Sequence, residues 1–189
     1  VHWPDLTKLE EGVREQIKNA QESLAATVKD PAKSETELSE AYGNLGQLYH
    51  AYSLARPARE SYTNAQILVP TDFRWPYLLG KLDQQEGLFE EASRHYRVAQ
   101  KLRPDYVPAL VNLGNIFLEL NRLDDAKENF QAALRLDENN AAIRYGLGQV
   151  AMSDRNYAEA VRHFEKTLAQ APGANRVHYS LAMAYRNLG

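Results

Sequence analysis

The sequence predicts an all-α protein built from repeated pairs of antiparallel helices. The first observation is a glycine that returns every 34 residues inside a helix-like segment, as Gly46, Gly80, Gly114 and Gly148. The second is that an alanine follows each glycine by 12 residues, and an aromatic residue follows that alanine by 4. A fixed period of about 20 to 50 residues is typical of helical arrays, in which stacked repeats bury a continuous core.

Further columns appear when Gly46 is numbered position 8 of a 34-residue repeat. Position 7 is leucine and position 20 is alanine in all four repeats. The remaining columns are position 24 (Tyr62, Tyr96, Phe130, Phe164), position 27 (Ala65, Ala99, Ala133, Thr167) and position 32 (Pro70, Pro104, Glu138, Pro172). Small residues at positions 8 and 20 let the two helices approach closely, which explains a glycine that otherwise costs a helix about 1 kcal/mol. The ring and the leucine fill the space between the helices, and the proline ends the second helix.

The turn between the two helices is clearest in the segment 119–126, which reads ELNRLDDA. We expect Asn121 to adopt the left-handed conformation there, because asparagine tolerates a positive φ. We also expect Asp124 to cap the following helix.

These columns together resemble the tetratricopeptide repeat over residues 39–189. The resemblance implies a right-handed α-solenoid of helix-turn-helix repeats, preceded by an extra helix. It divides the chain into an N-terminal part, 1–38, and the repeats 39–72, 73–106, 107–140, 141–174 and a partial repeat 175–189.

The second repeat departs from this pattern at two positions. Pro76 occupies position 4, where the family prefers a bulky residue, so we expect the helix to start late with Trp75 packing beside it. Position 11 favours an aromatic residue, but it holds Asp83 in this repeat and Ala151 in the fourth.

The two ends of the chain differ from the repeats. Apolar residues spaced by 3 or 4 between residues 5 and 29 predict one amphipathic helix, which packs on the first repeat and covers its open end. Ser34 and Glu37 have capping-box spacing and predict the start of the next helix. At the other end, residues 175–188 form the first helix of a fifth repeat, so we expect one apolar face of this helix to be uncovered.

Composition excludes several classes of function. The 22 basic and 25 acidic residues give a net charge of −3, which lacks the positive surface that nucleic acids select. No apolar run approaches the roughly 18 residues of a membrane span. Cysteine is absent, so disulfides and thiolate sites are excluded. The chain begins at Val1, so we expect a processed or trimmed product.

The sequence contains no recognisable catalytic constellation. No two of the five histidines have the i, i+4 spacing of a shared metal site, and no phosphate-binding glycine loop or nucleophile elbow occurs. His95 and His163 share position 23, which usually lies on the outer surface, so we interpret them as solvated. We therefore predict a protein that is not an enzyme and needs no cofactor or metal.

The resemblance places the first helix of each repeat on an inner, concave surface, where such proteins bind extended peptides or partner helices. Positions 2, 5, 6, 9, 12 and 13 face inward in these repeats. Amides can pair with a peptide backbone, and tyrosine offers a flat apolar area with a hydroxyl group. The predicted partner-binding residues are Tyr77, Lys81, Asn112, Asn115, Tyr145, Gln149, Tyr179 and Arg186.

One specialised use of this surface does not fit. The clamp of this family that grips acidic chaperone tails needs lysine, asparagine and arginine at set positions of three repeats. The better of two registers offers Tyr77, Lys81, Asn112, Ala142 and Gly146, of which only Asn112 agrees.

Three functional hypotheses follow. The first is a protein-interaction scaffold that binds a peptide or protein partner in its concave groove. The second is a self-assembly module, a homo-oligomer formed through the partial repeat at the C-terminus. The third is a regulatory arm of a longer enzyme. The phrases DFRWPYLLG and HYSLAMAYRNLG resemble tetratricopeptide proteins of the bacterial envelope, which favours an extracytoplasmic location without fixing it.

Overall fold

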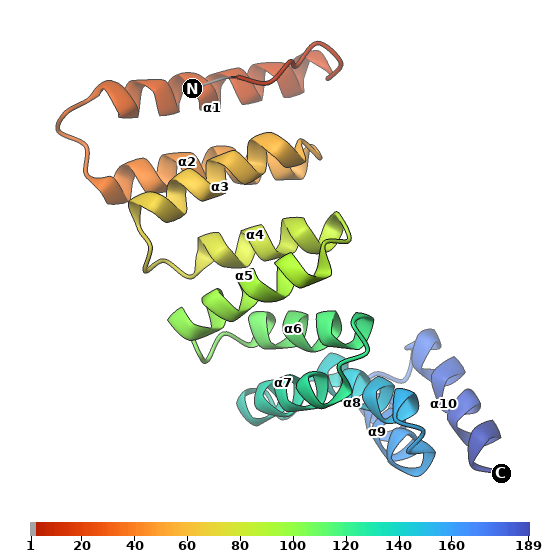
Figure 1. Ribbon diagram of the computed structural model, residues 1–189. Coiled ribbons are helices and arrows are strands. Elements are labelled where there is room, and N and C mark those ends of the chain that lie inside the picture. Colours follow the sequence, from red (N-terminus) through yellow and green to blue (C-terminus); the bar gives the residue numbers. More distant parts are fainter. Residues whose placement is uncertain (1–2) are drawn as a thin grey trace. The chain divides into compact units, whose positions relative to one another are not determined.

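The computed structural model describes residues 3–189 and divides into two compact units that meet between residues 102 and 103 (Figure 1). Every regular element in these residues is an α-helix. The first unit contains α1 (Glu11–Lys29), α2 (Glu35–Ala51), α3 (Ala55–Leu68), α4 (Arg74–Gln85) and α5 (Phe89–Leu102). The second contains α6 (Val107–Glu119), α7 (Leu123–Leu136), α8 (Ala141–Ser153), α9 (Tyr157–Gln170) and α10 (Asn175–Leu188). The predicted all-α class is confirmed.

Consecutive helices pack against one another within each unit. In the first unit α2 pairs with α3 and α4 with α5, while α1 packs on α2 and α3 packs on α4. In the second unit α6 pairs with α7 and α8 with α9, while α7 packs on α8 and α10 packs on α9. Figure 1 shows the two helices of each pair joined by a short turn.

The recurring glycines lie where a ring of the paired helix comes closest. A Cβ atom built on Gly46 would stand 2.7 Å from the ring of Tyr62, and one on Gly114 would stand 2.7 Å from the ring of Phe130. Gly80 meets Tyr96 at 2.8 Å in the same way. Such distances are shorter than any ordinary carbon contact, so an alanine here would force the ring to move. The ring at position 24 therefore determines why position 8 is glycine.

The turns inside the helix pairs share one backbone conformation. Position 15 has a positive φ in all four pairs: Ser53 (58°), Gly87 (75°), Asn121 (54°) and Arg155 (59°). The amide N–H of the next residue then donates to the carbonyl of position 11, at 2.7–2.9 Å in every turn. This is the left-handed helix ending that satisfies a free carbonyl. The prediction for Asn121 is confirmed, but Asp124 caps nothing, because α7 starts one residue earlier, at Leu123, after Arg122.

The N-terminal helix is shorter than predicted. It begins at Glu11 instead of residue 5, because the Asp5 side chain accepts a hydrogen bond from the Thr7 amide (2.9 Å) and holds this segment in a turn. Leu6 is nevertheless buried. The helix ends at Lys29, and the predicted capping box at the start of α2 is present, with the Ser34 amide donating to Glu37 and the Glu37 amide donating to Ser34 Oγ.

The proline in α4 lies in the first helical turn. The helix begins at Arg74, earlier than expected, and Pro76 is accommodated because the amides of a first turn have no partner within the helix. Trp75 is the second residue of α4 and is fully buried. Its indole lies in the space left by the missing side chain of Gly43, and its Nε1 donates to Ser39 Oγ at 2.9 Å.

Candidate functional site

The predicted partner-binding residues fall in both units. α4 of the first unit carries Tyr77 and Lys81. The other six belong to three first helices of the second unit, namely Asn112 and Asn115 on α6, Tyr145 and Gln149 on α8, and Tyr179 and Arg186 on α10. Each unit is therefore considered separately.

Tyr145 and Gln149 form a hydrogen-bonded cluster with Ser180 of α10. Gln149 Nε2 donates to the Tyr145 hydroxyl and lies 3.4 Å from Ser180 Oγ. The Tyr145 hydroxyl is also 3.4 Å from Ser180 Oγ. The other side of the Tyr145 ring packs against Phe164, with ring centroids 5.7 Å apart. The tyrosine and the amide are thus held in place by α9 and α10.

The α8–α10 cluster keeps its polar atoms partly accessible, since Tyr145, Gln149 and Ser180 are all half-buried. Among residues 3–189, no protein group donates to the Gln149 side-chain oxygen. A carboxamide with one fixed N–H and one open carbonyl can pair with the N–H of an extended chain. Sequence reasoning identified Tyr145 and Gln149, but it missed Ser180.

Tyr179 and Arg186 are exposed on α10. The Tyr179 side chain is 69% exposed, and Arg186 forms no ion pair with the residues that the structure describes. α10 buries Val177 and Ala184 against the preceding helices. Leu188, one turn after Ala184, is 52% exposed, and Tyr185 is 47% exposed although its hydroxyl donates to Glu165 of α9 at 2.7 Å. Apolar side chains of α10 are thus exposed, in agreement with the expectation that part of this helix is uncovered.

The two asparagines of α6 differ in accessibility. Asn115 is exposed and Asn112 is half-buried. Each of them directly precedes a fully buried residue of the helix, Leu113 or Ile116. Asn115 is therefore the more accessible of the two amides.

The first unit uses its predicted tyrosine mainly for packing. The half-buried Tyr77 ring lies against Tyr96, with centroids 5.7 Å apart and planes at 50°. Lys81, one turn further along α4, is exposed. Arg74, an inward position at the start of the same helix, is paired with Asp72 and Glu40 at 2.5 Å each. These ion pairs hold its pKa above the ordinary value and leave Lys81 as the accessible cation among these α4 side chains.

A charged group that sequence reasoning treated only as a departure lies inside the first unit. Asp83 is fully buried, with Arg59 Nη1 of α3 2.5 Å from one oxygen and His95 Nδ1 of α5 2.5 Å from the other. Arg59 also reaches Glu86 at 2.5 Å. The Arg59–Asp83–His95 triad thus connects three consecutive helices. A buried charge survives when it is paired in this way.

The interpretation of the two position-23 histidines as solvated is wrong. His95 binds Asp83, and its side chain is 31% exposed. His163 is only 20% exposed and lies 3.8 Å from Glu159, which also approaches Lys127 at 3.4 Å. Burial lowers the pKa of His163, although the Glu159 charge opposes this effect. His95 therefore joins α5 to α4, whereas Glu159, the partner of His163, lies on the same helix α9 and connects that helix to α7 through Lys127.

The described residues show no arrangement that would hold a metal ion. Within residues 3–189, no three histidine, cysteine, aspartate or glutamate side chains come together for that purpose. In the same stretch, no helix is both long enough and apolar enough to cross a bilayer.

Comparison with known proteins places these features in a family. The profile described as "Tetratricopeptide repeat" matches residues 77–141, 111–175 and 145–189, together more than half of the chain. A tetratricopeptide repeat protein from Parabacteroides merdae, of known crystal structure, superimposes with a TM-score of 0.78 at 22% identity. That match covers 95% of this chain and 75% of the other.

Curated relatives are longer than this chain. Human "Protein O-mannosyl-transferase TMTC3" is 28% identical over 79% of this chain, and the match spans 18% of its own length. "Anaphase-promoting complex subunit 6" of Arabidopsis thaliana is 33% identical over 56% of this chain, and the match spans 20% of its length. The chain therefore spans about a fifth of the length of these relatives. Their similarity concerns helical repeats, a fold that typically serves as a non-catalytic scaffold for protein interactions.

The helix pairs, the glycine-to-ring contacts and the matching family profile agree with one another. The all-α repeats are those of a helical solenoid fold. The chain therefore belongs to the tetratricopeptide repeat family.

Proposed function

We propose that the chain is a protein-interaction scaffold that binds an extended segment of a partner protein on the inner faces of its first helices. The α8–α10 cluster carries this proposal. It presents a fixed tyrosine hydroxyl and an open amide oxygen, and α10, which completes the cluster, also carries the exposed Tyr179 and Arg186. A fixed polar group costs less entropy on binding than a mobile one.

The predicted partner-binding residues of each unit favour a peptide that contains acidic or amide side chains. Arg186 and Lys81 are the accessible cations among the predicted partner-binding residues. Tyr179 supplies an apolar ring whose immobilisation removes only two side-chain torsions. The Arabidopsis relative is named as a subunit of a complex, which is in keeping with a role in assembly.

The experiment is affinity capture with the purified chain, followed by mass spectrometry and quantification of the captured partner. Lys81→Glu, Arg186→Glu and Tyr145→Ala, combined in one variant, should reduce capture at least tenfold, because the charge reversals and the ring truncation alter predicted inner positions in both units. Lys101→Glu combined with Arg162→Glu is the control, since both are exposed cations on second helices. Equal capture by wild type and the triple variant would show that the partner binds elsewhere.

A second candidate function is self-assembly through α10. The half-exposed Tyr185 and Leu188 favour it, because exposed apolar side chains on one helix face are typical of interfaces. Light scattering across a dilution series should then show a mass that rises with concentration. Tyr185→Glu combined with Leu188→Glu should keep the chain monomeric, and a wild type that is monomeric throughout would exclude this candidate.

A further inference from the structure

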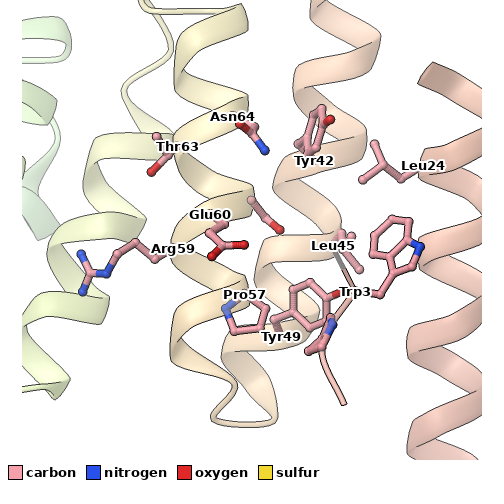
Figure 2. A pocket seen from close by; sticks show the side chains of 12 residues that line it. Trp3, Leu24, Tyr42, Leu45, Tyr49, Pro57, Arg59, Glu60, Thr63 and Asn64 are labelled. Atoms are coloured by element: carbon pink, nitrogen blue, oxygen red, sulfur yellow. The ribbon is translucent and has the colours of Figure 1, made fainter. Parts of the chain in front are cut away.

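A cavity of about 470 Å³ lies in the first unit, and none of the predicted partner-binding residues lines it (Figure 2). Its floor is formed by α2, through Tyr42, Leu45 and Tyr49. These residues occupy positions 4, 7 and 11 of the repeat, whereas the inward positions are 2, 5, 6, 9, 12 and 13. The cavity is therefore distinct from the inner surface. Its walls come from α3 on one side and from α1 with the segment that precedes it on the other.

The chain itself shows what kind of segment this groove accepts. Residues 3–6 are neither helix nor strand, and Trp3 packs against the buried cluster that contains Leu24, Leu45 and Tyr49. Leu6, three residues later, is 8% exposed. A non-helical segment with a large apolar side chain is thus already seated along the α1 side. Figure 2 shows the Trp3 indole beside Leu45, with the opposite wall formed by residues of α3.

The open part of the cavity combines apolar surface with a few polar groups. Pro57 and the floor residues supply the apolar part, while Asn64 is an exposed amide at the rim. A volume of about 300 to 1,000 Å³ with a mostly apolar lining is typical of a ligand pocket. An amide at the rim can pair with the backbone of an extended chain.

The charge on the wall is negative. Of the described lining residues, only Arg59 and Glu60 are charged. Arg59 binds Asp83 and Glu86, and Figure 2 shows its side chain extending away from the cavity. Among residues 3–189, the ion-pair partner of Glu60 is Arg56, whose side chain is 89% exposed. Pairs of this kind are weak and easily exchanged.

We propose that this α1–α3 groove binds an extended peptide segment of a partner protein in which a large apolar residue stands next to a lysine or arginine. The apolar side chain enters the cavity beside Trp3, and the cation pairs with Glu60. The peptide backbone meets Asn64. This is a second binding surface of the scaffold, with charge preference opposite to that of Arg186 and Lys81 on the inner faces.

The test uses three labelled, capped octapeptides, GSGFKGSG, GSGFQGSG and GSGFEGSG, and measures fluorescence anisotropy up to millimolar concentration. The wild type should bind the lysine peptide about tenfold more tightly than the glutamate peptide, with the glutamine peptide between them. Glu60→Lys should reverse this order, and Glu60→Gln should remove it. Failure of every peptide to bind, or an unchanged order in Glu60→Lys, would overturn the proposal.

Two further variants separate the groove from general electrostatics. Glu128 occupies position 22 on α7, the same position as Glu60 on α3, and is also exposed. Glu128→Lys makes the same charge change elsewhere and should leave the order intact; an equal reversal would contradict a local site. Asn64→Trp places a bulky ring at the rim and should weaken the lysine peptide at least tenfold, whereas unchanged affinity would show that the cavity is not used.

The tryptophans provide a direct readout of position. The chain has two, and Trp75 is fully buried in the core of the first unit. Unlabelled GSGFKGSG should therefore change the emission of Trp3 alone. The change should vanish in Trp3→Phe while anisotropy still reports binding. A signal that persists in Trp3→Phe would place the peptide outside the groove. Circular dichroism confirms that each variant keeps its helices.

Discussion

Position 11 of the repeat is filled in opposite ways in α4 of the first unit and α6 of the second. In α4 it is Asp83, fully buried and held by Arg59 and His95. In α6 it is Phe117, 1% exposed, with the Arg122 guanidinium 4.6 Å from its ring centroid. The backbone around the two residues is the same, because both carbonyls accept the hydrogen bond that closes the following turn.

This difference shows that position 11 of a complete repeat must hold a buried side chain, which can be either charged or apolar. An aromatic ring is stabilised there by apolar burial, which is proportional to the area removed from water. A carboxylate needs partners on the neighbouring helices, and Arg59 comes from the preceding pair. The buried Asp83 therefore connects its repeat to the preceding one through Arg59, whereas Phe117 fills space within its own repeat.

Replacing the apolar residue should have the largest effect. Phe117→Ala should destabilise the second unit by about 3–5 kcal/mol, because it leaves a cavity where a buried ring stood. Amide hydrogen exchange in α6 and α7 measures this loss. Glu119→Ala, an exposed neighbour on α6, should change stability by less than about 0.5 kcal/mol. Comparable losses in the two variants would mean that Phe117 is not part of the core.

Removing the buried carboxylate should have a smaller effect. Asp83→Ala should cost about 2–3 kcal/mol, below the roughly 3–5 kcal/mol of a fully buried pair, because Arg59 and His95 are each about one-third exposed and regain water. Hydrogen exchange in α4 and α5 reports the change. Glu86→Ala removes the exposed partner of the same Arg59 and should cost less than about 1 kcal/mol. Equal costs would contradict the assigned role of burial.

Protonation of His163 should give the smallest effect. Burial lowers its pKa in the folded chain, so below about pH 6.5 the unfolded state binds more protons than the folded state. Its contribution to stability is therefore fully present above that pH and is lost as the pH falls through this value towards the folded pKa. The free energy of unfolding, measured with urea at several pH values between 5 and 8, should depend less steeply on pH in His163→Gln than in the wild type. Identical slopes would mean that His163 titrates as in the unfolded chain.

The fold could be predicted because its causes recur in the sequence. Glycine, alanine, an aromatic ring and proline return at one spacing, and the ring at position 24 makes the glycine at position 8 necessary. The candidate site was only partly predictable. Tyr145 and Gln149 do come together, but Tyr77 is used for packing against Tyr96. The repeat position of a residue predicts that its side chain faces inward, but it does not predict whether a neighbouring helix will cover that side chain.

The Arg59–Asp83–His95 triad and the α1–α3 groove were missed because each is formed by residues at different positions of the repeat or outside it, whereas the sequence was read one position at a time. One signal was available. Three hydrogen-bonded pairs join residues 12 apart on the two helices of a repeat: His50 with Tyr62, Asp83 with His95, and Gln84 with Tyr96. A charged residue at position 11 with a histidine 12 residues later therefore predicts a contact. The groove had no such signal, since Trp3 precedes the repeats.

The left-handed residue at position 15 limits how these helix pairs can change over evolution. It is serine, glycine, asparagine and arginine in the four turns, so its side chain is free to vary within the strain that a positive φ imposes. The number of residues in the turn is not free. One inserted residue would rotate the second helix by about 100° relative to the first and carry its buried alanine and aromatic ring to solvent. Substitutions can accumulate in these turns, whereas insertions and deletions are tolerated only in whole repeats.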